Sequence, residues 1–455
     1  MRNKKLDRSE RMGKGSIPKL LLHFAAPAIT GLVAHALYNI IDRIFVGHAV
    51  GHIGIAAITV AFPFMITIMS FGILVGVGSS SLISIFLGEK NREKAETVLG
   101  NALTLLISGS IFLMVAGYFM GDRILLFSGA SPTIIPHALS YLDIIVMGIP
   151  FASMSFGFNY FIRAEGHPRY AMFTLVFGAI LNTILDAILI IHYSMGLQGA
   201  AIATVISQFV SALWVSMFYI YSRGTLSIAR KNLKLKWNIA KRILAIGFPP
   251  FLLEMTFVMV LALINRVIHY YGGDLGISAV GIFFSLDSLL FLPVIGIGEG
   301  VQPLIGYNFG SGDHDRVIHA IKLALLWAFT FFFMSFSIIM LFPEPLVGLF
   351  NKDNAELMAM ATRGMRIAYL CLPLLSVTII TSFTLQAMGK ARESLVLNLS
   401  RQVFIWIPLM IILPRIWGLD GVWMSIPISD GLGSILASFI LWKQIRHLGM
   451  TRKNL

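Results

Sequence analysis

The sequence predicts an all-α integral membrane protein with twelve transmembrane helices, and three observations lead to this fold class. Of its 455 residues, 57% are hydrophobic and only 13% are charged, whereas soluble domains carry roughly 25% charged residues. The apolar residues gather in long blocks, many of them reaching the roughly 20 residues that an α-helix needs to cross a bilayer. Finally, the basic residues fall in alternate connections between these blocks.

The apolar blocks are continuous rather than alternating, and transmembrane helices tolerate the Gly and Pro residues inside them. We therefore predict each block to be one helical span. In chain order, the predicted spans cover residues 17–46, 53–86, 95–120, 134–161, 170–192, 197–221, 239–270, 275–309, 317–342, 357–386, 394–413 and 418–442.

The positions of Lys and Arg predict the orientation. Cations occur near both termini and in residues 90–94, 163–169, 223–242, 316–322 and 390–392, while the intervening connections carry few or none. By the positive-inside rule, both termini are expected to be cytoplasmic, in the inner or plasma membrane of the cell, which requires an even number of spans. Because this distribution accounts for the net charge of +13, we predict no nucleic-acid partner.

The chain repeats itself once. A shift of 222 residues places Gly76 and Gly78 on Gly298 and Gly300, and further glycines near the end of each half also align. Six spans per half make this a parallel repeat, an arrangement typical of transporters with alternating access. The predicted parts are a cytoplasmic tail (1–16), an N-terminal lobe (17–221), a basic cytoplasmic linker (222–238), a C-terminal lobe (239–444) and a second cytoplasmic tail (445–455).

Two acidic residues lie inside predicted spans of the first half, Asp42 and Asp186. A charge at membrane depth costs at least about 2.5–3.5 kcal/mol, so such residues usually have a function. The repeat places Asn265 and Pro408 at the corresponding positions of the second half. We therefore expect the ion chemistry in the first half.

Polar residues accompany both carboxylates. Tyr38 lies one turn before Asp42, and Asn182 one turn before Asp186, so each pair shares a helix face; Thr204 adds a hydroxyl from the sixth span. Two buried carboxylates can accept a proton between them. Alternatively, the oxygens of Asp42, Asn182, Asp186 and Thr204 could ligate a hard cation such as Na⁺.

Less specific interpretations compete with this one. Asp42 could form a purely structural ion pair with Arg163, and Tyr38, Asn182 and Thr204 could only make bonds between helices. Glu254 and Glu299 are further acidic residues within spans. No His cluster or nucleophile motif appears, and Cys371 is the only cysteine. We therefore predict neither an enzyme nor a bound cofactor.

Several motifs lie along the chain. They are Pro27, Tyr38-Asn39, Asp42 and Phe45-Val46-Gly47 in the first span, Arg163-Ala164-Glu165-Gly166, Leu181-Asn182 with Asp186, Gly199-Ala200-Ala201 with Thr204, and Gln302-Pro303-Leu304-Ile305-Gly306-Tyr307-Asn308-Phe309-Gly310. Together these motifs resemble the multidrug and toxin extrusion (MATE) family. The resemblance covers nearly the whole chain, and the combination of motifs is specific.

The resemblance implies two six-helix lobes forming a V and an antiporter that exports lipophilic or cationic compounds in exchange for H⁺ or Na⁺. Within the family, the chain resembles the prokaryotic branch that has its ion site in the N-terminal lobe. This resemblance implies a cation-coupling role for Asp42, Asn182, Asp186 and Thr204. The substrate-binding residues that we expect are Tyr38, Asn39, Met65 and Asn159.

The wider superfamily also contains flippases for lipid-linked precursors, which tend to carry cations in the cavity. This remains the alternative function. The expected partners are small substrates and membrane lipids, and we expect the chain to act as a monomer.

Overall fold

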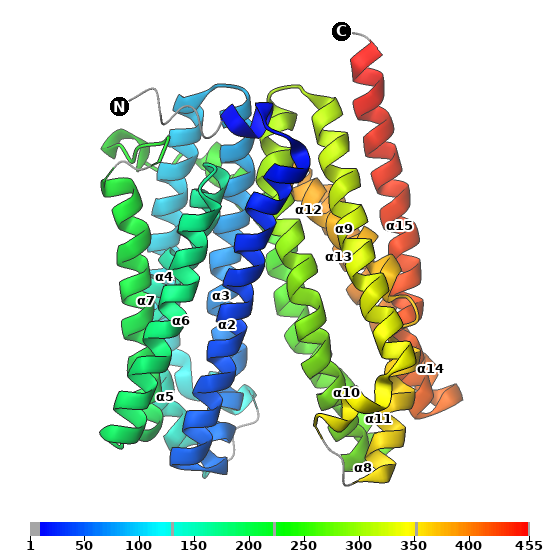
Figure 1. Ribbon diagram of the computed structural model, residues 1–455. Helices are drawn as coiled ribbons and strands as arrows, with labels where there is room; N and C mark the ends of the chain where they lie inside the picture. The colour runs from blue at the N-terminus through cyan, green and yellow to red at the C-terminus, as the bar shows by residue number, and fades with distance from the viewer. Residues whose placement is uncertain (1–9, 129–131, 222–223, 351–353, 454–455) are drawn as a thin grey trace. The chain divides into compact units, whose positions relative to one another are not determined.

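The computed structural model describes residues 10–128, 132–221, 224–350 and 354–453 (Figure 1). Within these ranges the regular structure is entirely helical, which confirms the predicted fold class. Helix starts follow local sequence signals. For example, the Asn91 side chain accepts a hydrogen bond from the Lys94 backbone N–H at 3.1 Å, which caps the helix that begins at Arg92.

The first six predicted spans are six helical segments joined by short connections. They are α2 (Ile17–Val50), α3 (His52–Gly88), α4 (Arg92–Phe127), α5 (Ile135–Ala164), α6 (Pro168–Asp186) continued by the π-helix η1 (Ala187–His192), and α7 (Gly196–Ile220).

The second half begins with a short 3-10 turn in the linker. Its elements are η2 (Arg230–Asn232), α8 (Trp237–Gly310), α9 (His314–Leu341), α10 (Pro343–Gly348), α11 (Ala355–Ala368), α12 (Leu372–Ala387), α13 (Ala391–Leu399), the π-helix η3 (Ser400–Trp406), α14 (Ile407–Trp417) and α15 (Leu419–Lys453).

Two helices of the second half depart from one helix per span. α8 covers two predicted spans and is broken at Gly273, whose φ of 58° lies in the left-handed region that favours glycine. The tenth span is divided into α11 and α12, which meet at an angle of 54°. Pro373 explains the break, because proline cannot continue the hydrogen-bond ladder of a preceding helix.

The described helices are sufficient for a multi-pass membrane protein. Ten of them are long and apolar enough to cross a membrane, and α11 with α12 supplies one more as a bent pair. The first segment of α8, up to Gly273, covers the seventh predicted span and is also helical. All twelve predicted spans are therefore helical in the structure.

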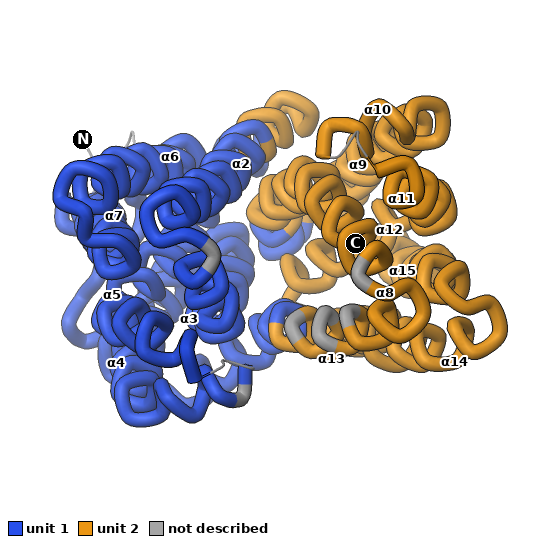
Figure 2. Tube along the Cα trace, turned by 90° about the horizontal axis from the view of Figure 1, so that it is seen from below, with its two compact units in different colours: residues 1–15, 26–254, 306–312 blue, residues 16–25, 255–305, 313–455 orange. Residues whose placement is uncertain are grey.

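The chain forms two compact units (Figure 2). Unit 1 contains residues 1–15, 26–254 and 306–312; unit 2 contains residues 16–25, 255–305 and 313–455. In unit 1, α5 packs against α3, α4 and α7, and in unit 2, α12 packs against α9 and α15. Both central helices belong to the fourth span of their half, as a repeat requires.

The linker is attached to α4 of unit 1. The Asn101 side chain donates to the Asn232 carbonyl at 3.3 Å and accepts from the Lys236 N–H at 2.6 Å. Thr104 donates to the Leu233 carbonyl at 2.7 Å. These bonds satisfy backbone groups that irregular structure leaves without helical partners.

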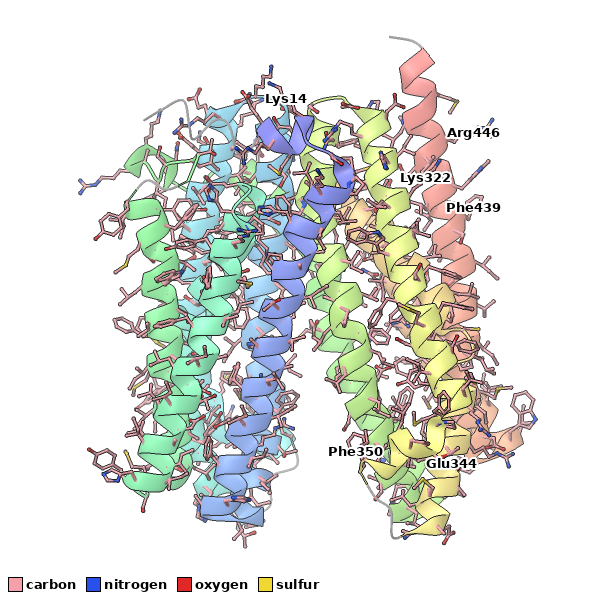
Figure 3. The ribbon with its side chains drawn as sticks, viewed as in Figure 1. Lys14, Lys322, Glu344, Phe350, Phe439 and Arg446 are labelled. Atoms are coloured by element: carbon pink, nitrogen blue, oxygen red, sulfur yellow. The ribbon has the colours of Figure 1, made fainter. Side chains whose placement is uncertain are left out.

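Unit 2 shows the surface expected of a membrane-embedded body. Lys322 and Arg446 lie toward one end of the unit, and Glu344 and Phe350 lie toward the other (Figure 3). Between them, α15 carries Phe439, which is 61% exposed and points outward. Exposed apolar side chains along the helices are stable where lipid rather than water surrounds them.

Candidate functional site in unit 1

The two predicted carboxylates are both buried in unit 1. Asp42 of α2 is 7% exposed, and Asp186, the last residue of α6, is fully buried. Within the described part of the chain, Oδ1 of Asp42 and both carboxylate oxygens of Asp186 lack a hydrogen-bond partner. The charge of Asp42 acts on Asp186. Because buried unpaired charges are costly, this pair favours binding of a cation.

The local backbone changes at Asp186. The α-helix α6 ends at this residue and continues as η1, in which the Tyr193 N–H donates to the Ile188 carbonyl at 3.0 Å. This five-residue step is the π-helical pattern, which occurs often at functional sites. Asp186 therefore lies at a junction between two helix types.

Asn182 and Thr204 lie together in unit 1. The Asn182 Nδ2 donates to the Thr204 hydroxyl at 3.4 Å, and both residues are buried. Among the described residues, Oδ1 of Asn182 has no hydrogen-bond partner. This oxygen, the Thr204 hydroxyl and the carboxylates are all suitable ligands for a hard cation.

Tyr141 belongs to the same polar cluster, although no sequence pattern indicates it. Tyr141 lies on α5, is 1% exposed and donates its hydroxyl to the sulfur of Met65 at 3.6 Å. Asp42, Asp186 and Tyr38 all act on it electrostatically. A buried tyrosine normally needs a polar partner, but the sequence does not indicate which span supplies it.

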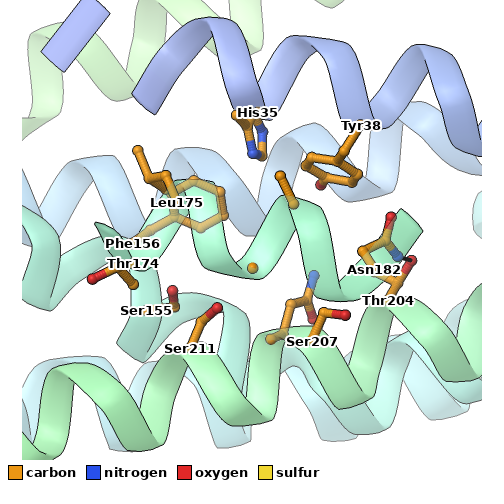
Figure 4. A pocket seen from close by; sticks show the side chains of 13 residues that line it. His35, Tyr38, Ser155, Phe156, Thr174, Leu175, Asn182, Thr204, Ser207 and Ser211 are labelled. Carbon is orange, nitrogen blue, oxygen red and sulfur yellow. Dashed lines mark hydrogen bonds between the residues drawn. The ribbon is translucent and has the colours of Figure 1, made fainter. Parts of the chain in front are cut away.

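A pocket opens beside this cluster (Figure 4). Its empty volume is about 430 Å³, a figure that includes space open to the outside. Asn182 and Thr204 belong to both the pocket and the polar cluster. The lining residues come from α2, α5, α6 and α7 and are His35, Tyr38, Ser155, Phe156, Thr174, Leu175, Gly178, Ala179, Asn182, Thr204, Ser207, Gln208 and Ser211.

One wall of the pocket is aromatic. The ring of His35 makes edge contacts with the rings of Tyr38, at 4.9 Å between centroids, and Phe156, at 5.4 Å. Figure 4 shows His35 and Tyr38 pointing from α2 into the pocket. Hydroxyl groups of five serine and threonine residues line other parts, so the pocket offers apolar contact together with adaptable hydrogen bonding.

Three predicted substrate-binding residues do not line this pocket. The Asn39 amide donates to the His35 carbonyl at 2.8 Å, and the Asn159 amide donates to the Ala171 carbonyl at 2.7 Å. Met65 instead accepts the bond from Tyr141. The substrate contacts of Asn39, Met65 and Asn159 stay predictions.

The alternative ion pair of Asp42 with Arg163 is not present in the described structure. The Arg163 guanidinium lies over the Tyr160 ring, 4.5 Å from its centroid. The next residue after Asp42, Arg43, is exposed and lies over the Phe62 ring at 5.2 Å. The geometry thus leaves Asp42 Oδ1 free to bind an ion.

Solved structures share this fold. A structure described as MATE in the bent conformation superimposes with a TM-score of 0.92 and 24% identity, covering 98% of this chain and 99% of that one. An outward-facing structure of a multidrug resistance MATE family transporter gives a TM-score of 0.91 at 24% identity, covering 97% and 98%.

Characterised relatives match over almost their full length. The multidrug export protein MepA of Staphylococcus saprophyticus is 27% identical over 429 residues, which cover 94% of each chain. MepA of Staphylococcus haemolyticus is 29% identical over 443 residues, which cover 97% of each chain. The MatE family model matches residues 27–188 and 249–412, which lie in the two halves of the repeat. The chain therefore belongs to MatE, a family of membrane transporters rather than enzymes.

Proposed function

We propose that this protein is a secondary active exporter of small lipophilic or cationic compounds, which it moves in exchange for H⁺ or Na⁺. Two MepA relatives named as multidrug export proteins match 94% and 97% of the chain. The unit 1 pocket supports the same function, because its aromatic wall and hydroxyl groups suit varied small molecules better than one polar substrate.

The observation that carries the proposal is that the residues one helix turn before the two unpaired carboxylates, Tyr38 and Asn182, line the pocket. Asp42 and Asp186 are buried with unpartnered oxygens, while Asn182 and Thr204 are shared between this cluster and the pocket. An ion that binds the carboxylates changes the charge beside the pocket wall. Binding of ion and substrate can therefore influence each other, which coupled exchange requires.

Two coupling ions remain in the proposal. A proton needs only one carboxylate as its acceptor. Na⁺ would use the oxygens of Asp42, Asp186, Asn182 and Thr204, since oxygen donors suit hard cations. The two differ in a simple way: only Na⁺ requires the neutral oxygens of Asn182 and Thr204 as ligands.

Efflux from proteoliposomes tests the function. The purified chain is reconstituted, the vesicles are loaded with a fluorescent lipophilic cation, and either a pH gradient or a Na⁺ gradient is imposed. Gradient-driven efflux identifies the coupling ion. If neither gradient drives efflux, the exporter proposal is wrong, and the flippase alternative is assayed with a lipid-linked pyrophosphate. The pocket has no Lys or Arg among its described lining residues, which disfavours that anionic substrate.

We also propose that both termini are cytoplasmic, that the lobes comprise residues 17–221 and 239–444, and that the protein acts as a monomer in the cell membrane. The basic connections support the orientation. A single cysteine introduced near Lys390, in a Cys371→Ser background, should react with a membrane-impermeant thiol reagent only after the cytoplasmic face is opened. Labelling of intact cells would contradict this orientation.

A further inference from the structure

Unit 2 contains a partly buried charge cluster that the mechanism above does not use. The Arg401 guanidinium of η3 pairs with the Asp430 carboxylate of α15 at 2.6 Å. Beside it, the Tyr369 hydroxyl at the end of α11 donates to Asp287 of α8 at 3.3 Å, and the charges of Asp430 and Arg401 both act on Asp287. We call Asp287, Tyr369, Arg401 and Asp430 the unit 2 charge cluster.

The repeat places this cluster where unit 1 has its pocket. The shift of 222 residues aligns Arg401 with Ala179 and Asp430 with Gln208, and both of these unit 1 residues line the pocket. Unit 2 therefore carries a guanidinium at a position where unit 1 leaves space for a ligand.

The neighbouring helix makes room for Arg401. A Cβ at Gly433 of α15 would lie 2.8 Å from Cγ and 3.0 Å from Cδ of Arg401, so the arginine stem passes directly over this glycine. The repeat aligns Gly433 with Ser211, and a Cβ at Gly178 would lie 2.6 Å from the Ser211 hydroxyl. Unit 2 thus has a glycine on α15 where unit 1 has a serine on α7.

The backbone around Arg401 is also fixed. Arg401 lies in the π-helix η3, and the Ser429 hydroxyl donates to its carbonyl at 3.0 Å. The side chain of Asp430 is 7% exposed and that of Arg401 is 25% exposed. The space above Gly433, the hydrogen bond from Ser429 and the ion pair with Asp430 together fix the position of the guanidinium.

The two units therefore neutralise their carboxylates differently. In unit 1, described oxygens of Asp42 and Asp186 lack partners. In unit 2, Asp430 has a guanidinium that stays protonated in proteins. A permanent cation in contact with the carboxylate occupies the place that an exchangeable ion would need.

We propose that Arg401 is a built-in counter-ion that closes Asp430 of unit 2 to the coupling ion. Arg401 is thus a specificity-determining residue for coupling. The role of Arg401 in coupling rests on the proposed exporter function. The proposal also makes a claim about cation binding that is measured without transport: removal of the guanidinium creates a site for one more cation.

The variant Arg401→Gln tests this claim in purified protein. Three other titratable groups interact with the carboxylates of Asp287 and Asp430. They are Tyr369 from α11, Cys371 from the α11–α12 connection, and Arg401 itself. Without Arg401, Asp430 must acquire a proton or Na⁺ to stay buried. Relative to the wild type, the variant should lose melting temperature as the pH rises from about 5 to about 9, and NaCl rather than choline chloride should restore it if Na⁺ binds.

Three control variants separate this effect from loss of structure. Arg401→Lys keeps a cation and should retain the pH profile of the wild type. Arg401→Gln combined with Asp430→Asn removes both charges and should abolish the extra pH and Na⁺ dependence. Arg363→Gln removes an exposed ion pair with Asp420 in the same unit and should show no such dependence.

The outcomes decide the proposal even when a single variant is unstable. Parallel melting profiles of wild type and Arg401→Gln at every pH and in both salts overturn it. If Arg401→Gln does not fold, the double variant must fold and melt without the extra pH and Na⁺ dependence, and collapse of the double variant also overturns the proposal. Because melting is read without substrate, failure of the exporter function would leave this result interpretable.

Discussion

The Asn182 side-chain amide donates to the Thr204 hydroxyl at 3.4 Å and thereby joins α6 to α7 at the edge of the pocket. Both residues line the pocket (Figure 4), and Asn182 lies one turn before Asp186 on the same helix. A change in the ionic state of Asp186 can thus reach the pocket through a single helix turn.

Thr204→Val should weaken coupling, because it removes a possible ion ligand and leaves the Asn182 amide without its acceptor. An unsatisfied buried donor costs about 1–3 kcal/mol, so we expect the ion concentration for half-maximal efflux to rise by about tenfold or more. Thr204→Ser keeps the hydroxyl and is the matched control. Equal ion dependence of the Val and Ser variants would show that the hydroxyl has no part in coupling.

Tyr141→Phe should alter coupling without loss of folded protein. The substitution keeps the buried ring and removes a hydroxyl whose described partner is only the sulfur of Met65. One hydrogen-bonding group contributes about 0.5–1.5 kcal/mol, so the ion dependence of efflux should shift by up to about tenfold. An unchanged dependence, together with an unchanged melting temperature, would exclude Tyr141 from the ion site.

Gly433→Ala should destabilise unit 2, since the added methyl group would lie 2.8 Å from the Arg401 stem. Overpacking of this kind costs about 1–3 kcal/mol. The control is Gly431→Ala on the same helix, where the nearest atom is the Cys371 sulfur at 3.6 Å, an ordinary contact. We expect a lower melting temperature for the first variant alone, and equal values for both would contradict the close packing of Arg401.

Glu165 provides a pH prediction outside the spans. It is fully buried at the end of α5, and burial raises its pKa from 4.5 to about 7, although the Leu226 N–H donates to it at 2.8 Å. A carboxyl whose pKa is raised on folding stabilises the folded state below its unfolded pKa. This contribution, on the order of 3 kcal/mol, is lost as the pH rises through about 7.

Glu165→Gln should remove this part of the pH dependence, because glutamine resembles the protonated acid. The melting temperature of the wild type should therefore fall relative to that of the variant between about pH 4.5 and pH 7. Glu93→Gln, at an exposed position on α4, is the control. If the difference between wild type and Glu165→Gln stays constant with pH, Glu165 does not titrate in this range.

Much of the architecture could be predicted from the sequence, because hydrophobic length and charge position dictate how a chain crosses a bilayer. All twelve predicted spans are helical, and the membership of a transporter family is confirmed. Helical spacing indicated that Tyr38 and Asn182 share helix faces with the two carboxylates, and both residues line the pocket. The coupling roles of Asp42, Asn182, Asp186 and Thr204 stay predictions.

Tyr141, Arg401 and Asp430 were not predicted from the sequence. Tyr141 joins the polar cluster only because α5 packs at the centre of unit 1, and helix packing is not visible in spacing along one helix. The ion pair of Arg401 and Asp430 could have been predicted from the sequence, because opposite charges inside neighbouring spans tend to pair at membrane depth. The break between α11 and α12 had a signal in Pro373, but its angle depends on tertiary packing.

Ion-driven efflux by Asp42→Asn and Asp186→Asn tests the central claim most directly. Each variant is compared in proteoliposomes with the wild type and with Asp143→Asn, the same change at an exposed carboxylate of α5. We predict that both site variants fold, bind substrate and lose gradient-driven efflux, while Asp143→Asn transports like the wild type. Efflux at the wild-type rate by either folded site variant would contradict the account.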